Sequence, residues 1–100
     1  MSLVLIKNGK VELRKDNGSL IRSIGNSNAI DANLNSENTL ILITYSNGKI
    51  DLRKENGSLV RSIGNGKAIG AKFNGENVLI QLSTGKQELR KENGSLIKVL

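Results

Sequence analysis

Residues 48–61 read GKIDLRKENGSLVR, and two close copies of this stretch occur elsewhere in the chain. Residues 9–22 read GKVELRKDNGSLIR, and residues 85–98 read GKQELRKENGSLIK. Nine of the fourteen positions are identical in all three copies, whose starting points lie 39 and 37 residues apart. The chain is therefore a repeat protein, and one repeated unit has to account for its fold.

Each unit is predicted to contain four short strands. The first covers residues 29–34 and 68–73, where apolar and polar residues alternate as in a strand with one buried face. The second strand is a near-continuous apolar run, which predicts burial on both faces. The second strands are residues 3–7, 39–45 and 78–83, the third follow each Gly-Lys pair, and the fourth are residues 19–24, 58–63 and 95–100. The first unit lacks a first strand, so eleven strands and no helix are expected.

The turns are predicted to be made by Asn-Gly pairs. Seven of the eleven glycines follow an Asn. Such pairs favour the type I′ turn, whose twist matches that of the flanking strands. Asn17-Gly18, Asn56-Gly57 and Asn93-Gly94 are expected to join the third and fourth strands of each unit, which makes the chain a meander of antiparallel hairpins.

These elements define the expected fold class. We expect a single all-β repeat domain over residues 1–100, with units at about 3–25, 26–64 and 65–100. An antiparallel four-stranded unit of roughly 40 residues has the size of a propeller blade. The expected architecture is propeller-like, with about three blades per chain. A β-prism and a β-trefoil remain alternatives.

The second complete unit resembles a blade of the Trp-Asp-repeat β-propellers. The similarity is carried by residues 68–80, AIGAKFNGENVLI, and by GKQEL at residues 85–89, and it extends over nearly the whole chain. It implies the propeller architecture. Arg-Lys pairs stand where that family has its Trp-Asp pair, and the chain has no His for the Gly-His pair. The buried hydrogen-bond network of the family is therefore not expected.

Catalytic chemistry finds few candidates in this composition. With no His and no Cys, the commonest general base, the thiolate nucleophile and the usual transition-metal ligands are missing. Ser19 and its equivalents follow Asn-Gly turns without a base to activate them. Asp16 and its equivalents recur beside lysines as surface partners, and Asp31 is replaced by Gly70 in the next unit. We expect no enzyme activity, no catalytic or metal-binding residue and no cofactor.

Positive charge is the main signal for a partner. The net charge is +6, and basic residues recur at equivalent positions of each unit. The candidate polyanion contacts are Arg14, Lys15, Arg22, Arg53, Lys54, Arg61, Arg90, Lys91 and Lys98. The other interpretation is that these charges discourage edge pairing by outer strands. If Arg53 and Lys54 lie on an exposed strand, replacing both with Ala is expected to leave folding almost unchanged.

The predicted function is a non-enzymatic binding or scaffold module. A lectin-like carbohydrate- or polyanion-binding protein is the alternative, although Tyr45 and Phe73 are the only aromatic residues available for stacking. Closed propellers have typically 4–8 blades, so we expect a homodimer that closes a six-bladed ring. A protein or polyanionic ligand is expected as partner, with no membrane. Because no signal peptide is recognisable at the start, a cytoplasmic location is expected.

Overall fold

The chain folds into short strands throughout. The computed structural model describes residues 2–25, 27–64 and 66–100. These residues form eleven strands and no helix. The strands are β1 (Ser2–Lys7), β2 (Lys10–Lys15), β3 (Leu20–Ile24), β4 (Ala29–Leu34), β5 (Leu40–Tyr45), β6 (Ile50–Lys54), β7 (Leu59–Ile63), β8 (Ala68–Asn74), β9 (Asn77–Leu82), β10 (Gln87–Lys91) and β11 (Leu96–Val99).

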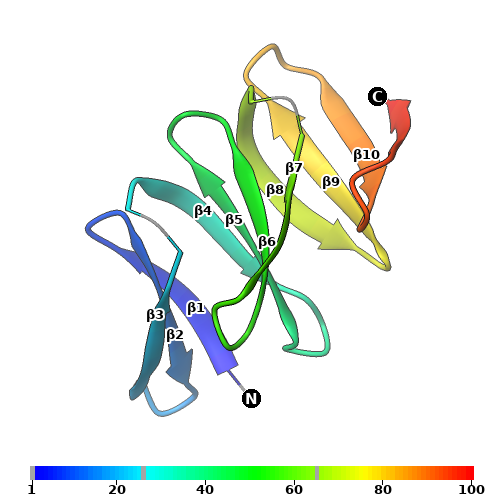
Figure 1. Ribbon diagram of the computed structural model, residues 1–100. Helices are drawn as coiled ribbons and strands as arrows, with labels where there is room; N and C mark the ends of the chain where they lie inside the picture. Colours follow the sequence, from blue (N-terminus) through cyan, green and yellow to red (C-terminus); the bar gives the residue numbers. More distant parts are fainter. Residues whose placement is uncertain (1, 26, 65) are drawn as a thin grey trace.

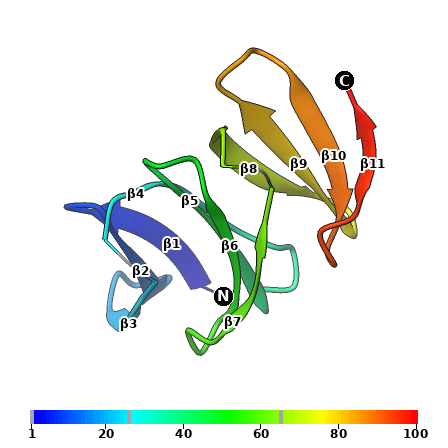
Figure 2. The same ribbon diagram turned by 45° about the horizontal axis from the view of Figure 1, so that its top comes forward.

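Within each sheet, strands that follow one another in the chain pair antiparallel. In the described part of the chain they form three sheets: β1–β3, β4–β7 and β8–β11. Figure 1 shows the sheets in a row in chain order, with the two ends of the chain on opposite end sheets. β4 packs against β8, which places the first strands of the second and third units together, and it also packs against β1, the second strand of the first unit. Figure 2 shows β11 at the outer edge of the last sheet. The prediction of an all-β chain of antiparallel repeat units is confirmed.

Backbone hydrogen bonds and apolar side chains join neighbouring sheets. The carbonyl of Gly9 accepts from the N–H of Ala29 at 2.7 Å, and that of Gly48 accepts from the N–H of Ala68 at 3.1 Å. Two apolar clusters lie beside these bonds. One consists of Val11, Leu13, Ile24, Ala29, Ile41, Ile43 and Tyr45, and the other of Leu42, Ile50, Leu52, Ile63, Ala68, Ala71, Val78, Ile80 and Leu82.

The middle sheet is covered on both faces. Alternate side chains of β5 enter the two clusters, with Ile41 and Ile43 on one side and Leu42 on the other. Each buried aliphatic side chain of this kind contributes about 1.5–3 kcal/mol. The predicted burial of both faces is therefore confirmed for the second strand of the middle unit.

The same prediction is wrong for the end sheets. On β1, Leu5 is 48% exposed. On β9, Leu79 is half-buried and Gln81 is exposed. The reason is that each end sheet has a neighbour on only one face. We call the uncovered side of β1–β3 the leading face (Leu3, Leu5, Lys7, Glu12 and Arg14) and that of β8–β11 the trailing face (Leu79, Gln81, Gln87, Leu89 and Lys98).

The described Asn-Gly turns are not all of one kind. At Asn8–Gly9 both residues have positive φ, 54° and 79°, as the predicted type I′ turn requires. The prediction is wrong for the three turns that join the third and fourth strands. There the glycine N–H donates to the carbonyl three residues back, as from Gly18 to Lys15 at 2.9 Å, and only the glycine has positive φ. This geometry is a type I turn followed by a left-handed glycine.

A side-chain hydrogen bond accompanies these three turns. In each of the three turns the Asn Oδ1 accepts from the backbone N–H two residues later, at 2.9 Å. Each Asn thereby forms a local turn of its own, and none of the three has positive φ. Asn65 of the pair Asn65-Gly66 lies outside the described residues.

Candidate interaction surface

An arginine and an acid recur as a pair on the third strand of every unit. They stand two residues apart on one strand, so their side chains point to the same face of the sheet. The Nε of Arg53 donates to Oδ2 of Asp51 at 3.0 Å, and that of Arg90 donates to Oε1 of Glu88 at 3.0 Å. In the first unit, NH2 of Arg14 donates to Oε1 of Glu12 at 2.6 Å. All three are charge-assisted hydrogen bonds of the strong kind.

The other side of each guanidinium binds the following turn. NH1 donates to the carbonyl of the turn glycine, at 2.6 Å from Arg14 to Gly18, and at 2.8 Å from Arg53 to Gly57 and from Arg90 to Gly94. Each arginine therefore connects the third strand of its unit to the turn that leads into the fourth strand. A network of arginine, carboxylate and turn carbonyl therefore lies at the positions where Trp-Asp-repeat blades have their Trp-Asp pair.

The middle unit adds an aromatic hydroxyl to this network. Tyr45 donates its hydroxyl to Oδ2 of Asp51 at 2.8 Å, and Asp51 is buried. The side chain of Arg53 is 16% exposed, which contradicts the premise of an exposed strand for this residue. Lys54, one position further along, is exposed. A replacement that leaves folding almost unchanged is therefore expected for Lys54 alone.

Two further arginines connect neighbouring sheets. NH1 of Arg22 on β3 donates to the carbonyl of Asn56 at 3.2 Å, and NH1 of Arg61 on β7 donates to that of Asn93 at 3.0 Å. Both acceptors lie in the turn between the third and fourth strands of the next sheet. Lys98 occupies the equivalent position on β11 and is exposed on the trailing face.

The structure thus divides the nine predicted basic residues into groups with different surroundings. Arg14, Arg53 and Arg90 bind carboxylates, while Arg22 and Arg61 bind turn carbonyls of the next sheet. The lysines Lys15, Lys54, Lys91 and Lys98 are exposed. The spacing of acid and arginine two residues apart is the signal in the sequence that distinguishes the first group, and it was not used in the prediction.

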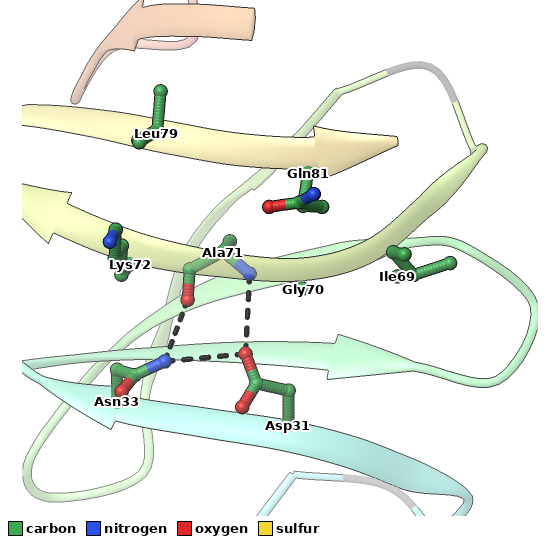
Figure 3. Close-up of a pocket in the computed structure, with 8 residues that line it drawn as sticks. All are labelled: Asp31, Asn33, Ile69, Gly70, Ala71, Lys72, Leu79 and Gln81. Atoms are coloured by element: carbon green, nitrogen blue, oxygen red, sulfur yellow. Dashed lines mark hydrogen bonds between the residues drawn. The ribbon is translucent and has the colours of Figure 1, made fainter. Parts of the chain in front are cut away.

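The first strands of the second and third units meet at an open hollow of about 350 Å³. Figure 3 shows Asp31 and Asn33 from β4 facing the backbone of Ala71 on β8. Nδ2 of Asn33 donates to the carbonyl of Ala71 at 2.7 Å, and the N–H of Ala71 donates to Oδ2 of Asp31 at 3.2 Å. Asn33 also donates to Asp31, at 3.3 Å. These two side chains form a clamp on the inner strand of the next sheet.

Gly70 leaves room for this clamp. A Cβ at residue 70 would lie 3.3 Å from Oδ2 of Asp31, closer than an ordinary contact. The sequence comparison of Asp31 with Gly70 argued only against a metal site. The clamp was not predicted, because Asn33 and Asp31 lie 38 and 40 residues from Ala71 in the chain. A local sequence pattern does not indicate a contact over such a separation.

The clamp leads to a stability prediction. Replacing Asn33 with Ala removes one donor to a backbone carbonyl, so the free energy of unfolding is expected to fall by about 1 kcal/mol. Lys72 on β8 is the matched control, because it holds the equivalent position and is exposed. Its replacement with Ala is expected to change stability by less than about 0.5 kcal/mol. Urea denaturation of both variants measures the difference, and equal losses would contradict the clamp.

Glu12, Asp51 and Glu88 bind arginines, and Asp31 accepts from a backbone N–H. Among the described residues, no three His, Cys, Asp or Glu side chains lie close enough to share a metal ion. Within the same ranges, no helix has the length and apolar character needed to cross a lipid bilayer.

Comparison with known proteins identifies the architecture. The chain aligns with BamB from Moraxella catarrhalis with a TM-score of 0.80 and 12% sequence identity, over 99% of this chain and 32% of that one. It aligns with the C-terminal WD40 domain of Sif2 with a TM-score of 0.76 and 15% identity, over 99% of this chain and 33% of that one. No protein-family model matches the sequence, and no curated protein matches it.

These matches show the fold. The chain has the architecture of WD40-like β-propeller blades, in agreement with the predicted resemblance. It spans about a third of the length of each matched structure. Its sheets form an open row, as blades of a partial propeller do.

Proposed function

We propose that this chain is a non-enzymatic binding or scaffold module that binds protein partners through its uncovered sheet faces. The observation that carries the proposal is the trailing face. Leu79 and Leu89 on this face occupy the positions that Leu42 and Leu52 hold in the buried cluster of the middle sheet. Uncovered apolar positions of this kind, surrounded by polar side chains, are typical of protein interaction sites.

The remaining surface supports binding over catalysis. Glu12, Asp51 and Glu88 each bind an arginine two residues away, which engages these carboxylates in structural contacts. A general acid or base needs access to a substrate proton. Serine hydroxyls in this chain have no His to activate them.

Aromatic burial weighs against the lectin alternative. Tyr45 is buried in the cluster between the first two sheets, and Phe73 packs partly buried against the other cluster. Sugar rings and unpaired bases are commonly bound by stacking on an exposed aromatic ring. Neither aromatic side chain of this sequence is placed for such stacking.

An array of peptides, glycans and nucleic acids tests the proposal, with binding measured at low and at high salt. We expect saturable binding of a protein partner, a second copy of this chain included, that persists at high salt and is lost when Leu89 is replaced with Lys. A matched control is Leu59→Lys, because Leu59 is 51% exposed on β7 of the middle sheet. Binding that is indifferent to Leu89→Lys, or turnover of any bound compound, would contradict the proposal.

The polyanion alternative rests on the repeated lysines and has a quantitative test. Lys15, Lys54 and Lys91 are exposed at equivalent strand ends. If they contact phosphates of duplex DNA, replacing all three with Gln lowers the slope of log affinity against log salt by up to about 2.7, from ~0.9 for each contact. We expect the unchanged protein to show no such slope. A steep slope that the triple replacement reduces would favour the polyanion function.

A further inference from the structure

The trailing face lacks the clamp that the middle sheet has. The strand pairing makes Gly70 and Lys72 the equivalents of Asp31 and Asn33, because Gly70 and Lys72 pair with Gln81 and Leu79 as Asp31 and Asn33 pair with Thr44 and Leu42. Glycine has no side chain, and lysine has no acceptor for a backbone N–H. The trailing face therefore cannot hold an inner strand of a following sheet in the way that β4 holds β8.

Part of the trailing face keeps the pattern of a covered sheet, while Gln81 and Gln87 stand where the middle sheet has the buried Thr44 and Ile50. Leu89 corresponds to the buried Leu52, and Leu100 pairs with Gln87 as the buried Ile63 pairs with Ile50. Leu100 is 60% exposed. The face thus suits a neighbouring sheet whose second to fourth strands are of the blade type and which has no inner strand at the clamp position.

The leading face of β1–β3 meets this description. Within the described residues this sheet has three strands, and β1 corresponds to the second strand of a unit. Leu3 and Leu5 stand where β5 has Ile41 and Ile43, which are buried against the preceding sheet. The described residues of this sheet include no inner strand, at the place where the trailing face lacks the clamp.

The polar contacts between sheets also fit a contact between the trailing face and the leading face. Arg22 and Arg61 each donate to the turn carbonyl of the following sheet, from Asn56 and Asn93. The equivalent donor on the trailing face is Lys98, and the equivalent turn on the leading sheet contains Asn17. An ammonium group at Lys98 can donate to that carbonyl across a contact between two chains.

We propose that the trailing face of one chain binds the leading face of a second copy, and that the reverse contact closes a ring of two chains. This inference rests on the proposed function and names its partner. Twice three sheets lie within the range of about 4–8 blades for closed propellers. The contact is head-to-tail, and two copies related by a two-fold axis make it twice.

Light scattering at micromolar concentration is the first test. The expected mass is twice 10.8 kDa. Leu5→Lys on the leading face and Leu89→Lys on the trailing face are each expected to weaken association more than about 100-fold, because the added charge would be buried in the contact. Leu59→Lys is the control and keeps the mass of the dimer. Circular dichroism confirms that each variant is folded.

Mixing the two variants tests the head-to-tail arrangement. The Leu89→Lys variant keeps an unchanged leading face, and the Leu5→Lys variant keeps an unchanged trailing face. A mixture of the two is therefore expected to form a one-to-one pair through a single contact between these unchanged faces. The double variant has neither face and is expected to stay at 10.8 kDa. A face that binds to itself would instead make only one of the two single variants monomeric, which contradicts the proposal.

Lys98→Glu keeps the proposal testable if an apolar variant fails to fold, because Lys98 is exposed. It is expected to weaken association by about tenfold through loss of a charged donor. A folded species near 10.8 kDa at every concentration overturns the second-copy assignment. If that monomer still binds peptides at high salt, the binding function stands without it, and if it binds nothing, both proposals fail.

Discussion

Replacing Arg53 with Leu is expected to lower the free energy of unfolding by about 3 kcal/mol, the lower end of the range for breaking a buried ion pair. The change leaves the buried carboxylate of Asp51 without its guanidinium, and the side chain of Asp51 is 10% exposed. The Tyr45 hydroxyl still donates at 2.8 Å, which limits the loss. The turn carbonyl of Gly57 loses its donor as well.

Urea denaturation at one protein concentration measures this loss. Lys54→Ala is the matched control, because Lys54 is exposed on the same strand, and its change is expected to stay within about 0.5 kcal/mol. Adding Asp51→Asn to Arg53→Leu removes the uncompensated charge, so the double variant is expected to regain part of the stability. If Arg53→Leu proves as harmless as Lys54→Ala, the network has no structural role.

Only part of this network could be predicted from the sequence. Acid and arginine two residues apart on a strand share one face, and this much follows from the period of two. Their burial does not follow, because it depends on the neighbouring sheet that covers the middle unit. The sequence predicted an exposed Arg53, because the chain is positively charged and Arg53 stands beside Lys54 in a repeated basic pair.

Strand positions were predictable because the repeat supplies the same evidence three times. The alternation at residues 29–34, for example, predicts β4 with the same bounds that the structure has. Burial was not equally predictable. β1 and β5 have similar apolar runs, yet Leu5 is exposed where Ile43 is buried, since only the middle sheet has neighbours on both sides.

Turn type was predicted correctly at Asn8–Gly9 and incorrectly at Asn17–Gly18, although the two dipeptides are identical. The deciding factor is where the strand ladder ends. Between Leu13 and Arg14 the pairing of β2 with β3 shifts register, and this leaves three residues in the loop instead of two. A dipeptide carries no information about that register.

Replacing Gly48 with Ala is expected to lower the free energy of unfolding by about 3 kcal/mol. Gly48 has a φ of +85°, and its carbonyl accepts from Ala68 across the contact between two sheets. A left-handed conformation costs an L-residue roughly 1–2 kcal/mol. The new Cβ would also overlap the carbonyl oxygen of Gly66 and lie 2.5 Å from its carbonyl carbon. Overpacking of this kind costs typically about 1–3 kcal/mol.

Gly85 provides the control that separates strain from overlap. It holds the same turn position in the next unit with a φ of +91°, and a Cβ at this residue would meet no described atom within 4 Å beyond its own chain neighbours. Gly85→Ala is therefore expected to cost only the backbone strain, roughly 1–2 kcal/mol. Urea denaturation of both variants gives the difference, which is the contribution of close packing between the second and third sheets. Equal losses for the two variants would mean that these sheets do not approach as closely as the hydrogen bond from Ala68 to Gly48 requires.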